Sequence, residues 1–185
     1  MSAMAGSTTP KENLLEAIRF GSPHYVPRWD EGVIKRFEFS DIVRRETWTD
    51  RWGVGWVLEL ADTVPFPKSN PLPDITVVED FAFPDPDTLS MSEETREAIR
   101  RTDEGRHLRI GSMAYFVFER AWALTGMEGF LMAMVEHPEE TKYLLHRIAD
   151  YAKRVFTRYL ELGLDGVTFS EDLGSQKAIM MSPTH

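Results

Sequence analysis

Cysteine is absent from the 185 residues, so the chain cannot form an internal disulfide, use a thiolate nucleophile or hold zinc through sulfur. Long apolar runs are also missing, because no stretch approaches the ~20 residues that span a bilayer. The first residues lack the basic region and apolar region that mark a signal peptide. Together these absences predict a soluble, cytoplasmic protein with no membrane partner.

Basic residues are in the minority. The chain has 21 Lys and Arg against 30 Asp and Glu, which gives a net charge of -9. An acidic surface argues against a nucleic-acid partner, because a phosphate backbone attracts cations. The hydrophobic fraction of 42% is ordinary for a globular protein, and the length suits one domain.

Helical and strand patterns alternate from Ser92 onward. Apolar residues at steps of three and four predict helices, and short apolar runs next to glycine predict strands. The predicted helices are 93–104, 116–124, 128–136 and 138–162, and the predicted strands are 107–111 and 164–169. This alternation predicts an α/β fold with a parallel sheet.

The first ninety or so residues carry weaker patterns. We expect residues 1–9, which are small and polar, to be frayed. A helix is expected to begin at Pro10, where the flanking sequence forms a capping box. The run TWTDRWGVGW predicts a strand, and its tryptophans are interpreted mainly as core residues. The proline-rich region after it predicts a long loop with an extended piece near 75–78.

Two carboxylates and an amide follow the last predicted strand. Glu171 and Asp172 come directly after 164–169, and Gln176 follows a glycine turn. Because the reactive end of a parallel sheet is at the carboxyl ends of its strands, Asp172 and Glu171 are the predicted catalytic residues. Gln176 is predicted to bind substrate. The spacing alone also fits solvated acids of an ordinary loop.

Three further residues are candidates for substrate binding. Asp50 lies in the tryptophan-rich run, and Tyr115 follows the strand predicted at 107–111, where it is placed to wall an apolar pocket. His24 stands in a short turn sequence, where a packed or surface histidine is the commoner outcome. No metal ligand is predicted within the chain.

Six segments, taken in order, resemble the N-terminal half of the uroporphyrinogen decarboxylase superfamily. That superfamily includes the decarboxylase and the corrinoid- and coenzyme-M-type methyltransferases. The segments are KENLLEAIRFGSPHYVP, TDRWGVGW, FPDPD, IGSMAYFVFERAWALTG, HPEETKYLLHRIADY and GLDGVTFSEDLGSQKAIMMSP. The last resembles the family's D-D-x-G-x-Q … S-P run, with Glu171 at the first Asp position.

The resemblance implies a (β/α)8 TIM barrel, with His24 at the position where its first strand would begin. Such a barrel typically needs ~250 residues, so residues 1–185 would form the N-terminal portion of the barrel domain, roughly its first half. A genuine small α/β domain is the alternative. The open sheet edges of a half-barrel predict self-association, that is, a homo-oligomer.

Departures from the family pattern favour its methyltransferase branch. The decarboxylases carry an Arg-bearing motif after the first helix, but here Arg28 is followed by Asp30 and Glu31, which would repel a polyanionic porphyrinogen. Val57 and Trp122 stand where an alignment places the catalytic Asp and Tyr of the decarboxylases. The D-x-W-G-V segment within TDRWGVGW resembles the methyltransferases.

The resemblance therefore implies a corrinoid-dependent methyltransferase that moves a methyl group between a small donor and a thiol or corrinoid. Its partners would be a small-molecule substrate and a corrinoid protein. In that branch zinc is held by His and Cys residues of the second half of the barrel, so zinc is expected in the full-length protein and no cofactor within this chain. Two alternatives stay open: a decarboxylase of a carboxylated, tetrapyrrole-like substrate, and a non-catalytic small-molecule-binding protein.

Overall fold

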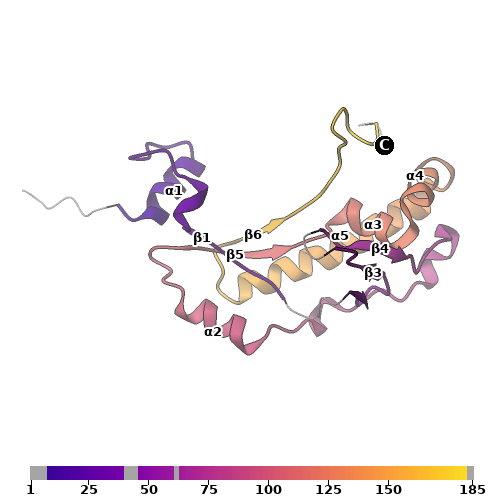
Figure 1. The fold of residues 1–185 in the computed structure, drawn as a ribbon, viewed down its shortest axis with the longest axis horizontal. Coiled ribbons are helices and arrows are strands. Elements are labelled where there is room, and N and C mark those ends of the chain that lie inside the picture. The colour runs from indigo at the N-terminus through magenta and orange to yellow at the C-terminus, as the bar shows by residue number, and fades with distance from the viewer. Residues whose placement is uncertain (1–7, 40–45, 61–62, 183–185) are drawn as a thin grey trace, which may run out of the picture.

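The computed structural model describes residues 8–39, 46–60 and 63–182. They form a mixed α/β structure in which a parallel three-stranded sheet and an antiparallel three-stranded sheet are combined with helices (Figure 1). The stretch predicted to be frayed, residues 1–9, lies outside the described residues except for Thr8 and Thr9. None of the described helices is long and apolar enough to cross a membrane.

The parallel sheet consists of β1 (Ile34–Phe37), β5 (Leu108–Met113) and β6 (Gly166–Phe169) in the order β1-β5-β6. The order of the strands in space is therefore their order along the chain. The sequence predicts β5 and β6, but no strand was predicted at the position of β1. Its sequence, IKRF, places two cations in four residues, and its partner strand lies far along the chain.

Helix α5 (Pro138–Glu161) covers one face of this sheet, as Figure 1 shows. Its predicted apolar stripe is confirmed, because Leu144, Ile148, Ala152, Val155 and Tyr159 are all buried. The helix and β5 approach closely at Gly111, where an added Cβ would lie 2.2 Å from Cγ of Tyr159. Glycine is needed at this point because only a hydrogen atom fits between the strand and the ring.

The other predicted helices of the C-terminal half are also present. They are α2 (Glu93–Arg101), α3 (Val117–Thr125) and α4 (Met127–Glu136). Helices α3 and α4 pack against each other through the rings of Phe118 and Phe130, whose centroids lie 5.7 Å apart. Both helices also contact α5, so the three form one layer beside the sheet.

Helix α1 (Pro10–Ile18) lies at the amino ends of β5 and β6. The predicted capping box is confirmed, with Thr9 and Glu12 bonding each other's backbone. Lys11 donates to Oδ1 of Asp165 at 2.7 Å, which fixes the helix beside the start of β6. The buried side chain of α1 is Asn13, which holds the following turn through the backbone of residues 24–25.

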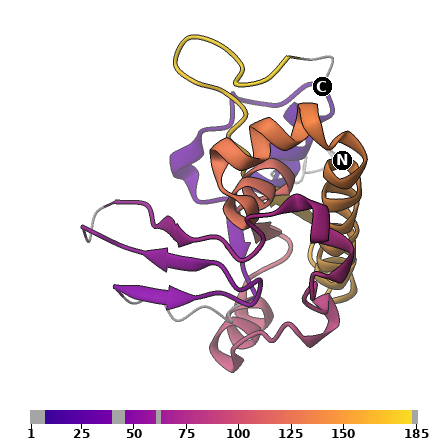
Figure 2. The same ribbon diagram turned by 90° about the vertical axis from the view of Figure 1, so that its right-hand side faces the viewer.

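The antiparallel sheet contains β2 (Thr47–Thr49), β3 (Gly55–Val57) and β4 (Phe66–Ser69), which extend to one side of the molecule in Figure 2. The tryptophan-rich run thus forms two paired strands rather than the single strand predicted. Trp48 pairs with Trp56 across the two strands, and their ring centroids lie 6.2 Å apart. The four-residue steps of the tryptophans therefore arise from a hairpin.

Three short 3-10 helices complete the described structure, namely η1 (Trp29–Glu31), η2 (Ile75–Asp80) and η3 (Pro86–Thr88). The extended piece predicted near Ile75–Val78 is therefore wrong. The carboxylate of Asp74 accepts a hydrogen bond from the backbone of Thr76, and this cap begins the helical turn instead of a strand.

Candidate functional site

A cavity lies at the carboxyl ends of β1 and β5, where the parallel sheet meets the antiparallel sheet. Glu38 and Phe39 enter it directly after β1, and residues 112–115 enter it from the end of β5 and the turn beyond. Trp48 and Trp56 add the wall from β2 and β3. The cavity leaves about 140 Å³ for the centres of water-sized molecules. Parallel sheets place their ligand sites at this end of the strands.

Asp50, a predicted substrate-binding residue, does line this cavity, but its carboxylate is saturated by the protein. Oδ1 accepts hydrogen bonds from the backbone of Trp52 at 2.9 Å and Val54 at 3.0 Å. Oδ2 accepts from Nε1 of Trp56 at 3.0 Å and from Arg120 at 2.6 Å. Only 2% of the Asp50 side chain is exposed, so this carboxylate organises the wall between β2 and β3.

Arg120 of α3 is the other half of this buried ion pair, with 7% of its side chain exposed. Its guanidinium carbon lies 5.2 Å from the ring centroid of Trp52 and 5.7 Å from that of Tyr115. Arg120 was not among the site residues predicted from the sequence. A signal was present, because the cation stands in the apolar run FVFERAWAL, where a charge needs a buried partner.

Tyr115, the second candidate that lines the cavity, has a backbone φ of 52°, in the left-handed region. An aromatic residue adopts that region rarely, at a cost of roughly 1–3 kcal/mol, so the fold holds it there. Its hydroxyl donates to the carbonyl of Pro65 at 3.2 Å, and its ring centroid lies 4.5 Å from that of Trp56. Tyr115 thereby joins the end of β5 to the antiparallel sheet.

Tyr159 of α5 ties the carboxyl ends of two parallel strands together beneath the cavity. Its hydroxyl donates to the carbonyl of Ser112 at 2.8 Å and accepts from the backbone of Phe39 at 3.0 Å. The ring also stacks on Phe39, with centroids 4.6 Å apart. The sequence placed Tyr159 on a buried helix face but carried no sign of these bonds, which join residues far apart in the chain.

The acid–amide cluster after β6 does not line this cavity. Glu171 accepts a hydrogen bond at 2.7 Å from the backbone of Glu119, in the first turn of α3. Asp172 and Gln176 are exposed, and the segment that carries them runs away from the sheet in Figures 1 and 2. The catalytic roles of Asp172 and Glu171, and the binding role of Gln176, stay predictions.

Glu119 is the titratable group most affected by this cluster. Burial raises the pKa of the Glu119 carboxyl, and the carboxylates of Glu171 and Asp172 raise that pKa further, against the opposing effect of Arg120. The acids after β6 thus meet the amino end of α3 at the residue before Arg120, beside the cavity but outside it.

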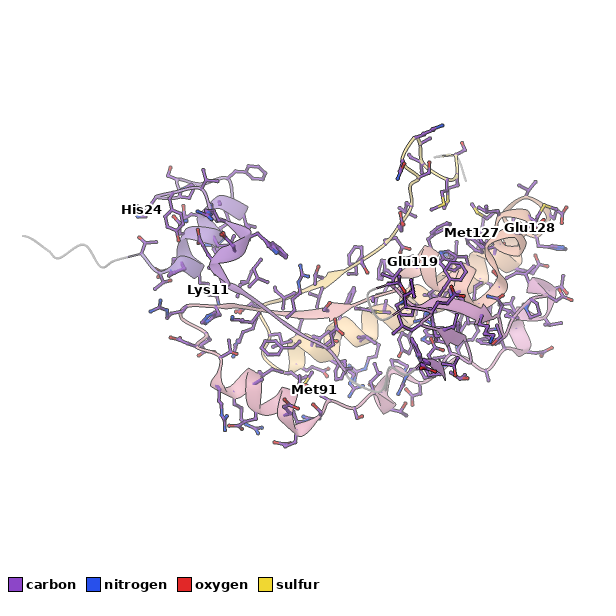
Figure 3. All side chains as sticks on the ribbon, viewed as in Figure 1. Lys11, His24, Met91, Glu119, Met127 and Glu128 are labelled. Atoms are coloured by element: carbon purple, nitrogen blue, oxygen red, sulfur yellow. The ribbon has the colours of Figure 1, made fainter. Side chains whose placement is uncertain are left out.

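His24 lies at the other end of the molecule. Figure 3 shows it near α1, well separated from Glu119. Its ring Nε2 bonds Oγ1 of Thr8 at 2.8 Å, and its backbone N–H donates to Asn13. The resemblance implied that the first barrel strand would begin at His24, but the first strand of the parallel sheet begins ten residues later, at Ile34. His24 is thus at the amino ends of the strands.

Within the described ranges, no group of three or more His, Asp or Glu side chains is arranged to hold a metal ion. The chain also has no cysteine. The zinc expected in the full-length protein stays a prediction, because the resemblance places its His and Cys ligands in the second half of the barrel.

Comparison with protein-family models, curated proteins and solved structures found no match for the chain. The cavity therefore supplies the main basis for assigning a function. Chemically, it offers aromatic walls and a neutralised Asp–Arg pair in a small, partly open cavity, which suits the binding of a small organic molecule.

Proposed function

We propose that the chain is the N-terminal part of a uroporphyrinogen-decarboxylase-like barrel enzyme whose small-molecule substrate binds in the cavity at the carboxyl ends of β1 and β5. One observation carries the proposal. The segments TDRWGVGW and IGSMAY, which belong to two of the six segments that carry the resemblance, lie far apart in the chain yet both line this cavity. The consecutive order of three parallel strands also supports the start of a singly wound barrel.

Within that superfamily we favour the methyltransferase branch, in which a methyl group moves between a small donor and a thiol or corrinoid carried by a partner protein. The D-x-W-G-V segment supports this branch, because its Asp50, Trp52 and Val54 form the turn that closes the cavity wall. In this enzyme the described residues would bind and orient the small molecule and exclude water from it.

A non-catalytic binding protein is the second candidate. The observation that favours it is the state of Asp50, whose two oxygens already accept four hydrogen bonds and so are not available as a general base. A decarboxylase of a carboxylated substrate is the third candidate, for which Arg51 and Arg120 supply cations at the cavity.

The experiment uses protein expressed from the complete reading frame. It is incubated without oxygen with methylcob(III)alamin and 2-mercaptoethanol, and the loss of the methylcobalamin absorption band and the formation of the methyl thioether are followed. We expect turnover above the protein-free rate. Binding without turnover would favour the binding protein, and release of CO2 from carboxylated probes would favour the decarboxylase.

Two variants of the same protein locate the site. Ala114→Phe places a ring at the cavity lining and is expected to abolish turnover, whereas Ala98→Phe on exposed α2 is its matched control. Asp172→Ala tests the acids after β6. We expect it to abolish turnover with an unchanged melting temperature, because Asp172 is exposed, and unchanged turnover would remove it from the site.

A further inference from the structure

Two buried hydrogen-bond donors at the cavity lack an acceptor. Nε1 of Trp48 and Nε of Arg120 are shielded from solvent, and no described residue accepts a hydrogen bond from either atom. Both side chains line the cavity. A buried N–H without an acceptor costs free energy, and such groups are few in native proteins. A ligand oxygen in the cavity would supply the acceptor that the described residues do not provide.

The formal charges of the residues that line the cavity sum to zero. Its charged lining residues are two acids, Glu38 and Asp50, and two bases, Arg51 and Arg120. The Asp50–Arg120 pair is almost fully buried, at 2% and 7% exposure of the side chains. An anionic ligand would add an uncompensated charge beside this buried pair, which is costly. An uncharged molecule with an acceptor oxygen avoids that cost.

The size and walls of the cavity favour a single ring. Its volume of about 140 Å³ resembles that of engineered protein cavities of about 150 Å³ that accept benzene. The lining includes the aromatic rings of Trp48, Trp52, Trp56 and Tyr115. Trp48 stacks on Trp56, and Trp56 tilts against Tyr115. Aromatic rings pack well in offset and edge-on contacts with one another.

We propose that the cavity selects an uncharged, one-ring aromatic molecule that carries a carbonyl-type acceptor oxygen, which receives hydrogen bonds from Trp48 Nε1 and Arg120 Nε. This inference rests on the proposed function, since it specifies the ligand class of the same site. It names two binding residues, Trp48 and Arg120, that the family resemblance does not supply.

Three probes of nearly the same shape test the ligand class. Benzamide is neutral and carries an acceptor, benzoate is anionic, and toluene has no acceptor. Their binding to the wild-type chain is measured by isothermal titration calorimetry at neutral pH. We expect benzamide to bind at least tenfold more tightly than benzoate or toluene. Equal binding of benzamide and toluene, or preference for benzoate, would overturn the inference.

Variants test the two donors. Trp48→Phe keeps a ring but removes the N–H, and it should weaken benzamide binding roughly tenfold, the effect of one lost hydrogen bond of about 1.4 kcal/mol, while leaving toluene unchanged. Trp29→Phe, at an exposed tryptophan away from the cavity, is the matched control. Arg120→Lys keeps the charge beside Asp50 but removes Nε, so it should also weaken benzamide binding. The melting temperature of this variant is measured as well, to show that it is folded.

The two proposals fail differently. If the probes bind but the Trp48→Phe variant keeps its full affinity for benzamide, the donor assignment is wrong and the cavity remains the ligand site. If no probe binds and Ala114→Phe leaves turnover of the full-length protein unchanged, then the cavity is not the site, and the proposed function fails together with the ligand class.

Discussion

At the scale of single residues, Asp50 is the side chain on which the cavity wall depends most. Its carboxylate accepts hydrogen bonds from two backbone amides and an indole of the stretch that folds back between β2 and β3, and from the guanidinium of Arg120 in α3. A buried acid with that many donors is typical of a structural centre. Its position at a cavity allows it to shape a ligand site without reacting.

Replacing Asp50 by Ala should lower the free energy of unfolding by about 3–5 kcal/mol, because Arg120 would be left as a buried charge without its partner. The matched control is Asp30→Ala, whose ion pair with Arg28 has both side chains more than half exposed and should cost about 0–1 kcal/mol. Urea denaturation, monitored through tryptophan fluorescence, measures the free energy of unfolding of both variants. Equal losses in the two variants would contradict the central role of Asp50.

Glu119 makes the stability of the fold depend on pH. Because its pKa is raised in the folded state by burial and by the neighbouring acids, the folded chain binds more protons than the unfolded chain as pH rises above the unfolded value of about 4.3. Stability therefore falls as pH rises through the window between the unfolded and folded pKa values, and this loss is absent below the unfolded pKa.

Glu119→Gln should accordingly raise the melting temperature at pH 7.5 and have a smaller effect at pH 4, which is below the unfolded pKa. Differential scanning calorimetry at both pH values gives the comparison. Glu94→Gln, at an exposed position of α2, controls for the loss of one charge. If Glu119→Gln raised the melting temperature equally at both pH values, titration of the Glu119 carboxyl would not be the cause of the increase.

At the scale of elements, the contact between β5 and α5 sets the position of the cavity. Gly111→Ala should destabilise the chain by about 1–3 kcal/mol or more, because the new methyl group would lie 2.2 Å from a Tyr159 ring held by two hydrogen bonds. Gly129→Ala in α4 meets nothing within 4 Å and should stabilise by about 0.5–1 kcal/mol. Thermal unfolding of both variants tests whether Gly111→Ala lowers the stability of the chain and Gly129→Ala raises it.

The same elements show what the sequence can and cannot predict. Helix α5 was predicted closely because its signals are local: a Pro at its start, a Gly after its end and an apolar stripe between them. Strand β1 was missed because its charged sequence becomes a strand only through pairing with β5. The tryptophan spacing was informative about packing, but it could not reveal a hairpin.

Prediction of the site was limited in the same way. Asp50 and Tyr115 were chosen from sequence context and do line the cavity. Arg120 and Tyr159 were missed, because the partners of both lie dozens of residues away along the chain. Asp172 was placed correctly at the carboxyl end of a strand, but the direction of the chain after β6 is a tertiary property that no local pattern encodes.

At the scale of the whole molecule, the parallel sheet has two open edges. Within the described part of the chain, β1 and β6 each pair only with β5, and β6 ends in Phe169, which is 52% exposed. In a closed barrel further strands would pair with both edges. An open edge of this kind offers unpaired backbone groups to a neighbouring molecule.

We therefore expect the 185-residue chain to self-associate as its concentration rises, and expect protein from the complete reading frame to associate less, if that frame supplies the remaining strands. Sedimentation velocity over a wide concentration range measures the self-association of both proteins. Thr168→Lys puts a charge on the β6 edge and should weaken association, whereas Thr157→Lys, at an exposed position of α5, should not. A chain that stays monomeric throughout would mean that these edges are already protected, and the half-barrel interpretation would lose its main structural consequence.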